Sequence, residues 1–218
     1  MKHKMFFIVA LGVLLVTFVA GTTFYYMLNK NQVSQLPEEK RAALVRMHSP
    51  TLGPMDAPVV VVEFIDPACE TCARFYPLVK QIMAANPGKI RLVLRYAPFH
   101  NGSDQVVAVL EAARKQGKFW QALEALLAKQ SSWAPNHTPQ VGLVWQQLEG
   151  LGLDLERARA DMASPALANV IAQDIADART LNVTKTPEFF VNGRPLPSFG
   201  FEQLQTLIND ELNKSQRR

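Results

Sequence analysis

The chain has 218 residues, 48% of them hydrophobic, with 23 Lys or Arg, 19 Asp or Glu and two cysteines. This much apolar sequence supports a folded core and excludes an intrinsically disordered chain. Two cysteines are too few for a disulfide-stapled mini-protein or for a zinc site made of cysteine alone, so they must act as one pair.

The net charge of +4 lies entirely in the first 46 residues, which hold six basic and two acidic side chains. The rest of the chain is neutral. A nucleic-acid-binding protein carries its positive charge on the folded part that contacts phosphates. The distribution therefore indicates no nucleic-acid partner.

An uncharged apolar segment covers residues 5–28. As a helix, its 24 residues would extend roughly 36 Å, enough to cross about 30 Å of hydrocarbon. A cleaved signal peptide is the alternative, although cleavage after Ala20 would place the bulky Phe18 where a small residue is preferred. Lys2 and Lys4 precede the segment and only Lys30 closely follows it, so the positive-inside rule puts residues 1–4 in the cytoplasm. We expect a membrane anchor with the rest of the chain outside.

Beyond the anchor, the polar, proline-dotted residues 29–52 are expected to form a linker, and a folded domain is expected at 53–213, followed by a basic tail at 214–218. Buried strands are indicated by β-branched runs, and helices by apolar periodicity between Gly and Pro breaks. The expected order is a strand at 59–65, a helix at 69–85, a strand at 90–96, a helical block at about 101–180, a strand at 188–191, a hairpin turn at 192–193 and a helix at 201–212. This order predicts an α/β fold.

The two cysteines form a Cys69-Glu70-Thr71-Cys72 motif where the first long helix begins. A thiolate at a helix N-terminus faces unpaired backbone N–H groups and the positive end of the helix dipole, which lower its pKa. Cys72 lies on the same helical face, close enough to close a disulfide. We therefore predict that Cys69 is the nucleophile and Cys72 the buried resolving thiol.

Two other uses of the pair were weighed. A static disulfide around so short a loop would stabilise the fold little. A metal site would need two further ligands, and no His or carboxylate falls at a recognisable ligand spacing. We expect redox chemistry without metal or organic cofactor, with a metal chaperone or a non-catalytic peptide-binding module as alternatives.

The Cys-x-x-Cys after the first buried strand, the helical block and Thr186-Pro187 before the strand at 188–191 together resemble the DsbA-like branch of the thioredoxin superfamily. The resemblance covers about residues 53–213. It implies a thioredoxin-like fold, with a mixed central sheet flanked by helices and a helical insertion. It also implies thiol:disulfide oxidoreductase activity.

The resemblance extends to supporting residues. Glu63 matches a buried acid that takes or relays the proton of the second cysteine; the alternative is a strand glutamate that points to solvent. Thr186-Pro187 matches a cis-proline loop beside the disulfide, although X-Pro bonds are cis in only about 5–6% of cases and the sequence does not reveal the isomer. We interpret His100 and Trp120 as packing or surface groups.

The direction of exchange depends on the acidity of Cys69. Glu70 and Thr71 separate the cysteines, and neither is basic. At about 6 Å and an effective dielectric constant between about 20 and 80, Glu70 would raise the Cys69 pKa by roughly 0.5 to 2 units. We expect oxidation of substrates, with a reductase or isomerase as the alternative.

These observations predict a membrane-anchored thiol:disulfide oxidoreductase of the bacterial inner membrane. Its catalytic domain would lie in the periplasm or another extracytoplasmic space, where disulfides persist. The expected partners are protein or peptide thiols and disulfides, a redox partner that resets the cysteine pair, and the membrane itself.

Overall fold

The structure is a computed structural model that describes residues 12, 14–23 and 36–217. The chain divides into two compact units, 1–35 and 36–218. In the first, residues 14–23 are helical with exposed side chains. The expected membrane segment at 5–28 lies largely outside the described residues, and no helix within the described ranges is long and apolar enough to span a bilayer.

The second unit is built on a five-stranded mixed sheet with the order β1-β3-β2-β4-β5. Its two long central strands, β2 (Val59–Ile65) and β3 (Ile90–Tyr96), run parallel. Three short antiparallel strands complete the sheet: β1 (Thr51–Leu52), β4 (Glu188–Val191) and β5 (Arg194–Pro195). The strands predicted at 59–65, 90–96 and 188–191 are confirmed.

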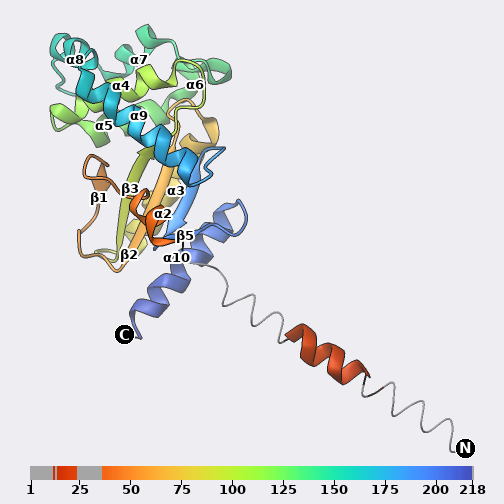
Figure 1. Cartoon of the computed structure of the whole chain (residues 1–218). Helices are drawn as coiled ribbons and strands as arrows, with labels where there is room; N and C mark the ends of the chain where they lie inside the picture. Colours follow the sequence, from red (N-terminus) through yellow and green to blue (C-terminus); the bar gives the residue numbers. More distant parts are fainter. Residues whose placement is uncertain (1–11, 13, 24–35, 218) are drawn as a thin grey trace, which may run out of the picture. The chain divides into compact units, whose positions relative to one another are not determined.

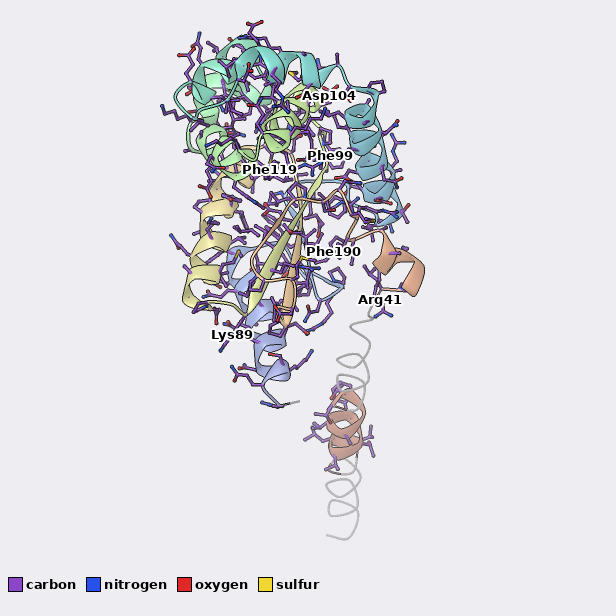
Figure 2. The ribbon with its side chains drawn as sticks, turned by 90° about the vertical axis from the view of Figure 1, so that its left-hand side faces the viewer. Arg41, Lys89, Phe99, Asp104, Phe119 and Phe190 are labelled. Atoms are coloured by element: carbon purple, nitrogen blue, oxygen red, sulfur yellow. The ribbon has the colours of Figure 1, made fainter. Side chains whose placement is uncertain are left out.

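Helices cover both faces of this sheet. One face packs against α3 (Glu70–Ala85) and α10 (Phe201–Ser215), and the other against the end of α9 (Pro165–Thr180) and residues next to α2 (Glu38–Ala42). Figure 2 shows α3, in pale yellow, and α9, in pale blue-green, on opposite sides of the strands. Because side chains alternate along a strand, Val61 belongs to the α3 side and Val62 to the α9 side.

The remaining helices lie between β3 and β4 in sequence and gather at one end of the strands (Figure 1). This helical block agrees with the insertion predicted at about 101–180. Its elements are α4 (Ser103–Lys115), α5 (Phe119–Ala128), α6 (Gln130–Trp133), the 3-10 turn η1 (Pro135–His137), α7 (Val141–Leu148), α8 (Leu155–Met162) and α9.

The linker predicted at 29–52 is wrong for residues 36–52, which pack on the domain. Leu44 is buried, β1 pairs with β3, and Arg46 forms a 2.6 Å ion pair with Asp177 of α9. The docking partners are distant in sequence, so the local polar pattern did not reveal them. At the other end, α10 continues to Ser215, into the predicted tail.

Candidate active site

Cys69 is the N-cap residue of α3, with extended backbone angles φ −82° and ψ 117°. Its N–H donates to the carbonyl oxygen of Asp66 at 3.0 Å, which closes the turn between β2 and α3. Both cysteines are free thiols, and their exposed fractions are 6% for Cys69 and 0% for Cys72. Of the two cysteines, Cys69 is therefore the one that keeps a small solvent exposure.

The surroundings of Cys69 favour its thiolate. A hydrogen bond from the Cys72 thiol is the largest cause and lowers the Cys69 pKa, while burial opposes it. The Thr186 side chain and the backbone N–H groups of Cys72 and Thr71 lower the Cys69 pKa further, from 9.0 to about 5. Cys69 is therefore almost fully ionised at neutral pH.

Cys72 has the opposite environment. Burial, its hydrogen bond to Cys69 and the negative charges of Cys69 and Glu63 raise the pKa of Cys72 well above 9.0. Two neighbouring thiols whose pKa values are pushed apart are suited to two different roles. The ionised Cys69 can attack, and the fully buried Cys72 can hold a proton until the pair closes.

Glu63 lies in the middle of β2, on the sheet face that packs against α3. Its side chain is fully buried, and neither carboxyl oxygen has a hydrogen-bond partner among the described residues. Burial, assisted by the negative charge of Cys69, raises the Glu63 pKa from 4.5 to about 8. The alternative of a solvent-facing glutamate is therefore wrong, and Glu63 is mainly protonated at neutral pH.

The Thr186-Pro187 peptide bond is cis, which the sequence did not determine. The Cys69 sulfur lies 3.3 Å from the carbonyl oxygen of Thr186. The loop before β4 therefore borders the nucleophile directly.

The two residues between the cysteines affect Cys69 differently from expectation. Glu70 is exposed and is not among the main causes of the Cys69 pKa, whereas the Thr71 backbone N–H lowers that pKa. The predicted rise from Glu70 is outweighed because solvent screens an exposed carboxylate, while the hydrogen bonds act directly on the sulfur.

Sequence reasoning missed the acid that organises the turn before Cys69. Asp66 is fully buried and accepts hydrogen bonds from the N–H groups of Ala68, Phe99 and His100 at 2.8–2.9 Å. It also accepts from His100 Nδ1 at 2.7 Å and from the Ser103 hydroxyl. The signal for it in the sequence is the Asp66-Pro67 pair directly before the Cys-x-x-Cys motif.

The partners of Asp66 come from the loop after β3, where the helical block meets the sheet, near the labelled Phe99 and Asp104 in Figure 2. The interpretation of His100 as a packing or surface group missed its bond to Asp66. Ser103 is the first residue of α4, whose N-cap is Gly102, and no side chain caps this helix. Trp120 packs against the core.

Within residues 12, 14–23 and 36–217, no three His, Cys, Asp or Glu side chains are placed to hold a metal ion together.

Comparisons with known proteins agree with this arrangement. Residues 46–210 match a protein-family model described as Thioredoxin. A thioredoxin-like oxidoreductase from Silicibacter pomeroyi DSS-3 has 30% identity and a TM-score of 0.69, covering 82% of this chain and 98% of its own. Alpha-DsbA1 of Wolbachia pipientis has the same fold, with a TM-score of 0.70, 17% identity and coverage of 80% and 96%.

Among curated proteins, Na(+)/H(+) antiporter NhaA 3 of Salinispora tropica is 37% identical over 145 residues. The match covers 65% of this chain and 21% of the antiporter, so the chain spans about a fifth of that relative's length. The transport activity is that of the longer protein. With a family match over well over half of its length and the Cys-x-x-Cys, cis-proline and helical block in place, the chain belongs to the thioredoxin family and is a DsbA-like member of its superfamily.

Proposed function

We propose that this protein is a thiol:disulfide oxidoreductase that oxidises protein or peptide thiols with the Cys69-Cys72 disulfide. The observation that carries the proposal is the separation of the two thiol pKa values. The pKa of Cys69 is lowered to about 5, and the pKa of Cys72 in the same motif is raised well above 9.0.

The exchange proceeds in two displacements. A substrate thiolate attacks the Cys69 sulfur of the disulfide, the sulfur-sulfur bond breaks, and Cys72 leaves and takes a proton from Glu63. A second substrate thiolate then attacks the substrate sulfur of the mixed disulfide, and Cys69 leaves as a thiolate. The substrate dithiol is oxidised by two electrons, and the cysteine pair is reduced.

The acidity of Cys69 supports the oxidising direction. Interactions that stabilise its thiolate exist only in the reduced protein. They therefore stabilise the reduced state and make the disulfide a stronger oxidant. A redox partner must then reoxidise the pair. A protein of the same fold that a partner keeps reduced would work as a reductase or isomerase.

Membrane anchoring is part of the same proposal. The uncharged segment at 5–28, with Lys2 and Lys4 before it, supports a single-pass anchor in a bacterial inner membrane with the domain on the outer side. Fractionation of full-length protein should place it in the membrane, with the domain accessible from outside. A mature chain that begins near Thr22 in mass spectrometry would contradict the anchor.

The reduction potential of the Cys69-Cys72 pair tests the activity and its direction. Equilibration with a glutathione series should give a potential well above the value of about −270 mV found for thioredoxin. A value near that of thioredoxin would instead favour a reductase. Zinc or copper retained stoichiometrically by wild type and lost in Cys69→Ser would favour a metal chaperone.

A further inference from the structure

The turn formed by Asp66, Pro67 and Ala68 carries the chain from β2 into Cys69. Each of these three residues makes a hydrogen-bond contact with a side chain from outside the turn. At its start, the carboxylate of Asp66 is fixed by the loop after β3, including His100 Nδ1 at 2.7 Å. The carboxylate also accepts the N–H of Ala68 within the turn at 2.9 Å.

The helical block holds the other two residues of the turn. The side-chain amide of Gln130, in α6, donates to the carbonyl oxygen of Pro67 at 3.2 Å. The Nδ1 atom of His137, in η1, lies 3.2 Å from the carbonyl oxygen of Ala68. Both carbonyls before Cys69 are thus bound by side chains that are more than 60 positions away in the sequence.

The two histidines are joined to each other. The rings of His100 and His137 stack, with centroids 4.6 Å apart and an angle of 17° between the planes. Because the Asp66 carboxylate and the Ala68 carbonyl offer only acceptors, the Nδ1 atom of each ring is the hydrogen-bond donor. The stack therefore links the loop after β3 to the helical block directly beside the turn.

The contacts of Gln130 and His137 with the turn involve a buried polar side chain and left-handed backbone. Gln130 is only 5% exposed, so its polar amide is buried in the contact. Asn136 and His137 have φ angles of 51° and 60°, in the left-handed region that few residues other than Gly adopt, although Asn and His do so more often than most. Unfavourable backbone of this kind persists where surrounding contacts fix it, and it gathers at functional sites.

We propose that Gln130, His100 and His137 are positioning residues that hold the turn 66–68 and thereby aim the backbone N–H groups at the start of α3 toward the Cys69 sulfur. They bond to the turn and act through it. The helical block therefore tunes the nucleophile, in addition to covering the end of the sheet. The inference deepens the proposed function, because the acidity of Cys69 sets the oxidising power of the pair.

The test compares three variants of the full-length protein with wild type: His137→Ala, His137→Gln and His48→Ala. His48 is a matched control, because its Nε2 lies 2.6 Å from the buried Asp174, in a His-Asp contact elsewhere in the domain. The thiolate absorbance of the reduced protein is titrated against pH, and the potential is measured against glutathione.

His137→Ala should raise the Cys69 pKa by about one unit, which weakens the oxidant about tenfold and makes its potential about 30 mV more negative. The glutamine variant keeps an N–H donor and should restore most of the wild-type pKa. His48→Ala should leave the Cys69 pKa unchanged even if the domain melts at a lower temperature.

An unchanged Cys69 pKa in His137→Ala, or an equal shift in His48→Ala, would overturn the proposal, since the contacts would then serve stability alone. If His137→Ala does not fold, Gln130→Met takes its place, because methionine has a similar size and cannot donate a hydrogen bond to the Pro67 carbonyl. The Cys69 pKa should rise by the same amount in this variant. An unchanged pKa would overturn the proposal equally. The titration does not need a substrate. A wild type without exchange activity would therefore refute the proposed function and leave the positioning role measurable.

Discussion

The Cys69 sulfur lies 3.3 Å from the carbonyl oxygen of Thr186, although the two residues are 117 positions apart. The contact joins the start of α3 to the loop before β4, and β2 and β4 are neighbours in the sheet. The Thr186-Pro187 loop therefore lies directly beside Cys69. The same sheet fixes the positions of the nucleophile and of this loop.

Single cysteine variants should separate the attacking thiol from the resolving thiol. Cys72→Ser should accumulate mixed disulfides with substrates, because the Cys69 thiolate still attacks and no second thiol of the motif releases it. Cys69→Ser should be inactive, because Cys72 is buried and its pKa is raised. Non-reducing electrophoresis after acid quenching measures the trapped species. Trapping by Cys69→Ser would reverse the two roles.

The acidity of Cys69 should appear in the pH dependence of its alkylation. A thiol with a pKa of about 5 is almost wholly ionised above pH 7, so the iodoacetamide rate of the reduced protein should be nearly constant from about pH 7 to 8 and fall to half near pH 5. An ordinary thiol would show a rate that rises about tenfold per pH unit over this range. A rate that still increases steeply at pH 7 would refute the lowered pKa.

Glu63 should make the folded protein less stable as the pH rises, which is opposite to the usual effect of a carboxylate in a folded protein. Its pKa is about 8 in the folded protein and near 4.5 when unfolded, so its contribution is present below pH 4.5 and is lost as the pH rises toward 8. At about 1.4 kcal/mol per unit, the loss reaches about 5 kcal/mol. Cys69 opposes it in the reduced protein, because its lowered pKa gives a contribution that is present above pH 9.0 and lost as the pH falls through about 5.

Glu63→Gln removes the pH-dependent contribution of Glu63 to stability and leaves that of Cys69. In urea unfolding of the reduced protein, wild type should change little in stability between about pH 5 and 8, whereas the variant should become more stable with rising pH, by up to about 4 kcal/mol between pH 5 and pH 8. The oxidised protein is the control, because its disulfide does not titrate: wild type should lose stability with rising pH and the variant should not. A flat profile for the reduced variant would contradict the assignment.

Glu70→His should have a smaller effect than the Glu70 charge alone suggests. Because Glu70 is exposed and screened, the substitution should lower the Cys69 pKa by less than about one unit. Thr186→Val, which removes a hydrogen bond to Cys69, should raise the same pKa. Thiolate absorbance titrations of both variants measure the two shifts. A drop of two units or more in Glu70→His would show that the dipeptide controls the acidity after all.

The sequence alone determined the elements that carry the site. The apolar-rich runs that became β2 and β3 predicted the buried strands with their observed bounds, and in β2 burial on both faces leaves an almost continuous apolar pattern. The position of Cys69 before α3 predicted a lowered pKa, because the free N–H groups at a helix start are a property of local backbone geometry.

The residues that surround Cys69 and hold the turn before it come together only in the tertiary structure. Asp66, Gln130 and His137 meet beside Cys69 only after folding, and Arg46 finds Asp177 only across the domain. Hydrogen bonds and burial depend on which distant groups are brought within about 3 Å, and local patterns carry no such distances. For the same reason the Glu70 charge, visible in the sequence, gave a misleading prediction, while the contacts that set the Cys69 pKa were visible only in the fold.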